Sequence, residues 1–539
     1  MKKGNKTLAA LALCACMTAG CSLVHESYSE ISTDIYPSNA EEADAMILAN
    51  VYQVFNIWHV FNPDVTGWWT MSNIVSDQFD SQYSGSYIGF DLTAQDNHES
   101  GTGGYPFLDE DNYTPLYLRS RFLSKMLLTK ERIKNVPMTD ARKKRMNAEI
   151  HCGMGFLAFL AYDLYGPVSL PTLEILQNPA ADLAVRRATE EEMQQYIESN
   201  LAEALKDDAL PARCDGAEYG RFTRGLAFMV LFKYCMLMGG MKEKESAGSG
   251  APWWEKAETA GRELLKPEYG YALEDDYNAL FSEAGEKNRE VIFSGIADPA
   301  MASTYVASVI PSDFDTPGQN LQKWGVFKLR WDFYHTFEEH DLRTQRIITE
   351  YVSTAEGHPV RSEANDATQE NIRTGLRLGA LPVKFDYSTT IGSSCPVDVP
   401  MYRFADALTL LAEAIVRNAG TVTTEAVGYL NDVRRRAFGA YHTPKQPSDF
   451  AGAEDFLEQL LMERAHELWF EGHQRQDQIR CGKFIEACME KGRKGYLPIA
   501  RIEHMRQQTV PGKYDFERFP VPLSAIREGR GVILQNPGY

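Results

Sequence analysis

The sequence predicts a mainly α-helical fold with long irregular loops and few short strands, and three observations lead to that prediction. Ser38 and Glu41 have the Ser-x-x-Glu spacing of a capping box at a helix start. Thr189 and Glu192 repeat the motif, and apolar residues after both starts recur at intervals of three and four. In contrast, residues 270–400 are rich in Gly, Pro and Thr with few periodic runs, which indicates loops.

Helices are expected along most of the chain. The first, after Ser38, places Ile47, Val51 and Phe55 on one face. Residues 221–238 are apolar on most sides, so we expect an internal helix there. The other expected helices cover about 114–136, 140–165, 189–205, 403–417, 424–437, 454–470 and 477–490, and a short strand is expected at 291–295.

Composition and charge restrict the class of protein. The chain has 539 residues, 44% apolar and 11% aromatic, which is typical of a globular protein and excludes a disordered one. Its 74 acidic residues outnumber its 55 basic ones, for a net charge of −19. Affinity for nucleic acid comes from clustered Lys and Arg, so this charge argues against a nucleic-acid partner. No apolar run approaches the roughly 18 residues that cross a membrane, which excludes a polytopic membrane protein.

The N-terminus has the features of a bacterial export signal. Basic residues at its start precede the apolar residues 8–17, a run too short to span a bilayer. Thr18-Ala19-Gly20-Cys21 resembles the lipobox of a lipoprotein, in which the Cys is acylated and becomes the new N-terminus. We therefore expect residues 1–20 to be a cleaved signal peptide, Cys21 a lipid anchor and residues 21–32 a lipidated tether. An ordinary secretory signal is the alternative.

Motifs for catalysis or metal binding are lacking. No P-loop, GxSxG or HExxH zinc motif is present. The six cysteines after Cys21 form no CxxC pair, and we interpret them as small buried hydrophobes, with a shared metal or disulfide role for Cys481 and Cys488 as the alternative. We expect no cofactor and assign no metal ligands, although the Asp-rich loops leave a Ca²⁺ site open.

Aromatic residues give the positive signal for a binding site. Ten lie between Tyr52 and Phe90, where the average content predicts about four. Several fall in a segment rich in Gly, Ser, Asp and Asn, as expected of a surface loop. An exposed ring offers an apolar face to sugar C–H groups, and neighbouring polar side chains supply hydrogen bonds. The alternative is a loop that packs its own aromatics. A second platform is expected in the middle of the chain, beside Lys328 and Arg330. The candidate ligand-binding residues are Trp68, Trp69, Asn73, Asp77, Tyr83, Tyr87, Trp324 and Trp331.

The C-terminal half carries a family resemblance. Residues 401–420 (MYRFADALTLLAEAIVRNAG), 429–440 (YLNDVRRRAFGA) and 460–483 (LLMERAHELWFEGHQRQDQIRCGK) resemble the C-terminal signature of the SusD/RagB family of outer-membrane nutrient-binding lipoproteins. The segments 148–172 and 196–205 agree with other family blocks in order. Gln474 and Gln478 depart from the signature, where Arg and Leu are usual.

This resemblance implies both fold and function. It implies a SusD-like, tetratricopeptide-type helical scaffold at about 38–238 and 401–490, with a loop-rich ligand-binding insertion at about 245–400, within one domain of residues 33–539. It further implies a surface-exposed lipoprotein of the outer membrane that captures oligosaccharides and delivers them to a SusC-like TonB-dependent transporter, without enzyme activity. Oligopeptide capture on the same scaffold is the nearest alternative. A helical surface glycoside hydrolase is a more distant one, and it needs two carboxylates about 5–9.5 Å apart in one cleft.

Three glutamates, Glu463, Glu467 and Glu471, bear on the choice between a binding protein and a glycoside hydrolase. They are spaced at i, i+4 and i+8, as on one helix face, beside Arg464. Paired carboxylates can serve acid–base catalysis. We favour a structural interpretation, in which they form ion pairs that join helices, with Arg434 and Arg480 as candidate partners.

Overall fold

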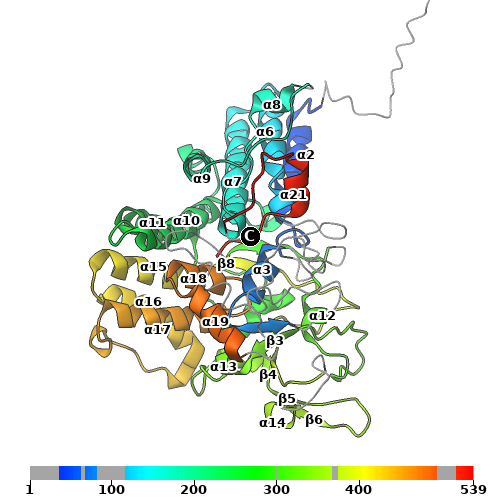
Figure 1. Ribbon diagram of the computed structural model, residues 1–539, viewed down its shortest axis with the longest axis vertical. Helices are drawn as coiled ribbons and strands as arrows, with labels where there is room; N and C mark the ends of the chain where they lie inside the picture. The colour runs from blue at the N-terminus through cyan, green and yellow to red at the C-terminus, as the bar shows by residue number, and fades with distance from the viewer. Residues whose placement is uncertain are drawn as a thin grey trace, which may run out of the picture.

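The computed structural model describes residues 36–61, 67–81, 116–178, 180–298, 301–366, 374–494 and 517–537. Within these ranges the protein is mainly helical, with a few short strands in its lower right part (Figure 1). The predicted fold class is confirmed.

The N-terminal helices form the upper part of the molecule and its left side (Figure 1). The long helix α7 packs against α9 and α6, and α10 packs against α11. Their bounds are α2 Ala40–Asn50, α3 Trp68–Ile74, α5 Leu116–Arg119, α6 Phe122–Ile133, α7 Asp140–Tyr165, α8 Leu173–Gln177, α9 Glu190–Ala204, α10 Arg224–Glu245 and α11 Ala251–Glu263.

Two predicted helix starts turn out differently. At α9 the capping box is confirmed, with Thr189 and Glu192 exchanging side-chain to backbone hydrogen bonds. At α2 the cap is shifted by one residue: the Asn39 side chain accepts from the Glu42 amide. The Glu42 carboxylate accepts in turn from the backbone and hydroxyl of Ser38. Asn is as good a cap as Ser, so sequence spacing alone does not choose between the two frames.

Helix α10 is internal, as expected. It is long and apolar enough to cross a membrane, but 83% of its most apolar window is buried inside the protein. A Cβ on Gly239 would lie 2.4 Å from the buried Trp254 ring, so Gly239 lets α11 approach α10 closely. This close packing explains why α10 is part of the core.

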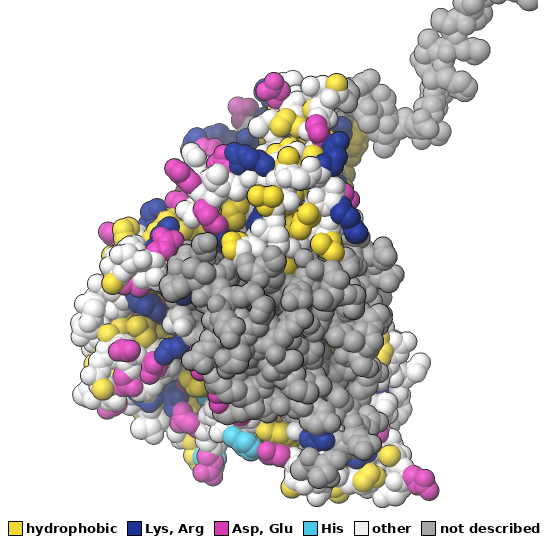
Figure 2. Space-filling model, viewed as in Figure 1, with side chains coloured by type: hydrophobic (Ala, Val, Ile, Leu, Met, Phe, Trp, Pro, Cys, Tyr) yellow, Lys and Arg dark blue, Asp and Glu magenta, His cyan; other side chains and the backbone are white. Residues whose placement is uncertain are grey.

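The C-terminal helices continue the array. Helix α15 packs on α11 and is followed by α16 and α17, so successive helical hairpins stack side by side as in a tetratricopeptide array. Acidic and basic side chains are interspersed over this left flank (Figure 2). The bounds are α15 Phe404–Ala419, α16 Thr424–Phe438, α17 Ala453–Glu467, α18 Gln474–Arg480, α19 Phe484–Lys494 and α21 Leu523–Glu528.

Two expected helices are broken. The segment expected at 114–136 is interrupted at Ser120 and Arg121 between α5 and α6. The segment expected at 477–490 is divided between α18 and α19, because Gly482 has a φ of +68° that a continuing helix does not permit.

The strands lie mostly within the expected insertion. A four-stranded sheet has the order β1-β3-β7-β4, and all its pairs are antiparallel. Strand β2, the predicted strand, pairs with β8. The bounds are β1 Phe79–Ser81, β2 Val291–Gly295, β3 Phe327–Arg330, β4 Ile347–Ile348, β5 Glu350–Val352, β6 Val360–Ser362, β7 Gly379–Pro382 and β8 Val399–Arg403, with short helices α12 Tyr305–Val309, α13 Trp331–Tyr334 and α14 Glu363–Asp366 between them.

A buried network of ion pairs joins the insertion to the C-terminal helices. Arg403, on β8, donates to Glu467 Oε1 at 2.6 Å, to Glu290 at 2.7 Å and to both oxygens of Glu471. Glu463 accepts from Arg343 at 2.7 Å and from Arg434 at 2.6 Å. All three signature glutamates are therefore held by cations from other elements, which supports the structural interpretation.

The details correct two expectations. Glu471 is not on the helix of Glu463 and Glu467, because α17 ends at Glu467 and Phe470 takes a φ of +63°. Arg480 belongs to a second buried network, where it donates to Glu413 at 2.7 Å and Asp477 at 2.8 Å.

Candidate ligand-binding site

The sheet brings the two predicted aromatic segments together. Strand β1 follows α3, which carries Trp68 and Trp69, while β3 leads directly into α13, which begins at Trp331. In the antiparallel β1–β3 pair, Phe79 lies opposite Leu329 and Ser81 opposite Phe327. Segments about 250 residues apart in sequence are thus neighbours in space.

Trp68 and Trp69 are core residues. They lie on α3 with exposures of only 2% and 1%. Trp69 Nε1 donates to the Phe470 carbonyl at 2.9 Å, and its ring lies 4.7 Å from that of Phe470. The Trp68 ring lies against Gly472 and meets His473 edge-on at 5.9 Å. The expectation of two exposed loop residues is wrong, because both rings pack under the C-terminal signature and offer no free face.

Asn73 and Asp77 also contact that signature. Asn73 is buried and accepts from the Gly472 amide at 3.1 Å, while it donates to the Trp69 carbonyl at 2.9 Å. Asp77 is half-buried and accepts from Gln474 at 3.2 Å. Burial raises the pKa of Asp77 although Gln474 and Gln478 hydrogen-bond its carboxylate. Asn73 holds α3 to the turn before α18, and Asp77 holds the residues after α3 to α18 itself. Tyr83 and Tyr87, like Cys21, lie outside the described residues.

Trp331 forms a partly exposed aromatic platform with its neighbours. Its ring is half-buried and stacks on His335, with centroids 5.9 Å apart and planes 24° apart. Tyr334 meets the same ring edge-on at 5.7 Å. Trp331 Nε1 donates to the Leu376 carbonyl at 2.6 Å, so the polar edge of the indole faces the protein. We call Trp331, Tyr334 and His335 the α13 platform.

Carboxylates border this platform. His335 Nε2 lies 2.9 Å from Glu363 Oε2, and both side chains are about half exposed. Asp332 accepts from Arg330 at 3.0 and 2.9 Å, and Arg330 also lies 3.1 Å from Asp80 on β1. A rigid aromatic surface with carboxylate acceptors at its edge matches the chemistry of a sugar ring, which has apolar C–H faces and hydroxyl donors.

Trp324 lies apart from that cluster. Its backbone amide donates to the carbonyl of Ala307, within α12, at 2.7 Å, and its side chain is half-buried. Ile391 is 75% exposed, and its neighbour Gly392 pairs with the segment before Trp324. Trp324 remains a second candidate contact.

Sequence reasoning missed four members of the α13 platform and its border. They are Asp332, Tyr334, His335 and Glu363. The run Trp331-Asp-Phe-Tyr-His335 concentrates four ring side chains in five positions and is the signal that points to it. Glu363 had no such signal, because it joins the platform only through the fold.

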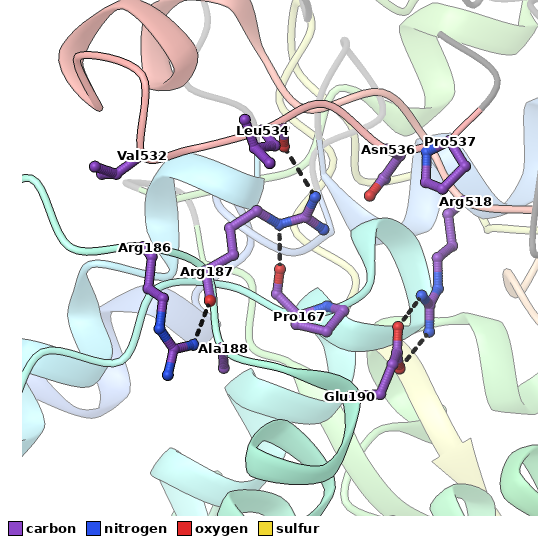
Figure 3. Close-up of a pocket in the computed structure, with 10 residues that line it drawn as sticks. All are labelled: Pro167, Arg186, Arg187, Ala188, Glu190, Arg518, Val532, Leu534, Asn536 and Pro537. Atoms are coloured by element: carbon purple, nitrogen blue, oxygen red, sulfur yellow. Dashed lines mark hydrogen bonds and ion pairs between the residues drawn. The ribbon is translucent and has the colours of Figure 1, made fainter.

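A separate cavity of about 510 Å³ lies between the segment before α9 and the C-terminal tail (Figure 3). Its charged groups are satisfied within the protein: Arg518 pairs with Glu190, and Arg187 donates to the carbonyls of Pro167 and Leu534. No aromatic ring is among its lining residues, so the α13 platform is the better candidate for a sugar.

Comparison with known proteins shows a family similarity in the C-terminal part of the chain. The sequence model described as the SusD family matches residues 311–539. Over these residues the chain is similar to the SusD/RagB family. The starch-binding protein SusD of Bacteroides thetaiotaomicron is 30% identical over 142 residues, which is 26% of this chain and 22% of that protein.

Solved structures share the SusD fold. Surface glycan-binding protein A from Bacteroides thetaiotaomicron, solved in complex with laminarihexaose, has a TM-score of 0.67 and 19% identity over 93% of this chain and 99% of that one. A SusD superfamily protein from Parabacteroides distasonis has a TM-score of 0.70 and 19% identity over 95% and 100% of the two chains. A laminarin-binding SusD-like protein has a TM-score of 0.67 and 19% identity over 93% and 100%.

The SusD signature occupies a defined place in this fold. It comprises β8, α15, α16, α17 and α18, and it carries both buried ion-pair networks. Its two departures, Gln474 and Gln478, both hydrogen-bond Asp77. In this chain the signature therefore holds the scaffold together and anchors the residues just before β1, the strand that pairs with β3.

Proposed function

We propose that this protein binds oligosaccharides at the cell surface and passes them to a SusC-like TonB-dependent transporter without cleaving them. The observation that carries the proposal is the α13 platform on a SusD fold, with its half-buried Trp331, stacked His335 and bordering carboxylates. The glycans in the names of its relatives, starch and laminarin, support a glycan as the ligand class. The proposal includes cleavage of residues 1–20 and lipid anchoring to the outer membrane through Cys21.

The platform is preorganised for this role. The indole Nε1 hydrogen bond to Leu376 fixes the Trp331 ring, and Arg330 fixes the Asp332 carboxylate. A ligand therefore orders few side chains when it binds, which lowers the entropic cost. Trp324, which lies apart from the platform, is a second candidate contact for the ligand.

The test is isothermal titration of protein beginning after Cys21 with laminarin and starch oligosaccharides and with oligopeptides. We expect saturable glycan binding that weakens at least about tenfold, or about 1.4 kcal/mol, when Tyr334 and His335 are both replaced by Ala. Trp331→Ala is a third variant, checked for folding by its melting temperature. Trp253→Ala is the matched control, since Trp253 is a partly buried tryptophan on α11.

Each outcome has a distinct meaning. Glycan binding that the platform variants leave unchanged contradicts the site. Peptide binding without glycan binding keeps the scaffold and changes the ligand to an oligopeptide. Shortened glycans, detected by chromatography after incubation, contradict the binding function in favour of a glycoside hydrolase.

A further inference from the structure

One end of this acidic protein is strongly basic. Between residues 125 and 145 there are only two acidic residues, Glu131 and Asp140, whereas the whole chain has a net charge of −19. The basic residues of this segment are Lys125, Lys130, Arg132, Lys134, Arg142, Lys143, Lys144 and Arg145. We call this segment the basic tip.

The basic tip is the end of a helical hairpin. It comprises most of α6, the connection to α7 and the first turns of α7, in the upper part of Figure 1. The start of α2 lies beside it, because Arg142 donates to the Glu41 carboxylate at 2.7 Å and to the Ala40 carbonyl at 3.1 Å. The first described residues of the chain therefore enter the fold at this tip.

Much of this positive charge is available to an external partner. Lys130, Arg132 and Lys143 have no carboxylate partner among the described residues, and the Lys143 ammonium donates to the Lys134 carbonyl at 2.9 Å. The Lys144–Asp207 pair has both side chains more than half exposed, so its attraction is weak.

A cleft runs along this surface. Its volume is about 490 Å³, and it lies between α6, α7 and the end of α9. Five lysines and three carboxylates are among its lining residues: Lys130, Lys134, Lys143, Lys144, Lys206, Glu131, Glu203 and Asp207. Lys134 and Lys144 pair with Glu131 and Asp207. Phosphate oxygens are suitable partners for the ammonium groups of Lys130 and Lys143, which have no carboxylate partner among the described residues.

We propose that the basic tip faces the anionic surface of the membrane and binds the phosphates of its lipids, which orients the protein upright on that surface. This inference rests on the lipid anchor in the proposed function. Fifteen positions separate Cys21 from Tyr36, a span of at most about 50 Å, so the anchor keeps the α2 end of the molecule near the lipids.

Charge complementarity selects this face. An acidic protein is repelled by an anionic surface, and screening at physiological salt limits the interaction to about 8 Å. Only a locally basic surface gains energy on close approach, and each Lys or Arg near such a surface strengthens binding by roughly fivefold. Lys130, Arg132 and Lys143, which have no carboxylate partner among the described residues, should together strengthen binding to the anionic surface by about 100-fold.

The experiment is vesicle co-sedimentation of the unacylated protein that starts after Cys21. The vesicles are phosphatidylcholine alone or phosphatidylcholine mixed with phosphatidylglycerol. We expect binding to the anionic vesicles only, with loss of binding as salt is raised. In the variant K130E/R132E/K143E, binding falls about 100-fold, while its melting temperature and glycan titration match the parent protein. The control K256E/R435E/K483E makes the same charge change at exposed positions of α11, α16 and the turn before α19, and keeps its binding.

Two results would overturn the inference. One is that K130E/R132E/K143E binds the anionic vesicles as well as the parent protein does, which includes the case in which neither protein binds them. The other is tight binding of soluble polygalacturonate without vesicle binding, which assigns the tip to an acidic glycan instead. Neither result bears on the α13 platform, since the vesicles contain no oligosaccharide and the glycan titration is measured separately.

Discussion

Replacing Arg403 with Met tests whether the buried ion-pair network stabilises this fold. Arg403 is fully buried and donates to Glu290, Glu467 and Glu471 at 2.6 to 2.8 Å. Met fills a similar volume without charge, so the variant leaves three buried carboxylates with fewer cations. Removing one partner of a buried ion pair costs about 3–5 kcal/mol. An unfolding entropy near 2.1 cal/mol/K per residue gives roughly 1 kcal/mol/K for this chain, so the melting temperature should fall by about 3–5 °C.

Differential scanning calorimetry at pH 7 measures that shift. The matched control is Arg262→Met, because Arg262 pairs with Glu425 at 2.7 Å on the surface and should contribute less than about 1 kcal/mol. A melting temperature for Arg403→Met no lower than that of Arg262→Met would refute the reasoning.

Three further predictions follow from single features. Burial raises the pKa of Glu467, but its arginine partners outweigh this and lower the pKa from 4.5 to about 2. The stability that the ionised Glu467 carboxylate contributes is therefore complete above pH 4.5 and is lost as the pH falls toward 2. Urea unfolding at pH 7, 4 and 3 should show a midpoint concentration that falls with pH, and an unchanged midpoint would contradict this prediction. Gly239→Ala should lower the melting temperature, because the new Cβ would lie 2.4 Å from the Trp254 ring. Gly428→Ala should raise the melting temperature slightly, because a Cβ at that helical position has no atom within 4 Å. Equal effects of the two substitutions would contradict the close packing of α10 on Trp254. Thr189→Ala should lose about 1 kcal/mol of stability with the capping box, measurable by urea unfolding, and a neutral effect would show that the cap is dispensable.

Local patterns predicted the helices well. The capping box at Thr189 and the apolar periodicity of 140–165 and 424–437 are properties of short segments, and the structure confirms the helices there. The breaks at Ser120 and Gly482 were not predicted, because neither interrupts the apolar pattern. Such breaks are decided by what each turn packs against.

The candidate site depended on distant contacts. The aromatic content around Trp68 and Trp69 was visible in the sequence, but only the tertiary structure places both rings under Phe470 and Gly472 in the core. The composition of a segment does not reveal which of its rings another segment covers. Trp331 was a candidate from the beginning, yet its stacking on His335 depends on the fold of α13, and the approach of Glu363 depends on where the fold places α14.

The sequence by itself determined the helical class, the SusD/RagB signature and the charge contrast between residues 125–145 and the whole chain, because periodicity, motif and charge are written residue by residue. Only the tertiary structure decided that Glu471 joins Glu467 through Arg403 rather than through a shared helix. It also decided that the basic tip lies beside the start of α2. Both are contacts between segments far apart in sequence, and such contacts exist only once the chain has folded.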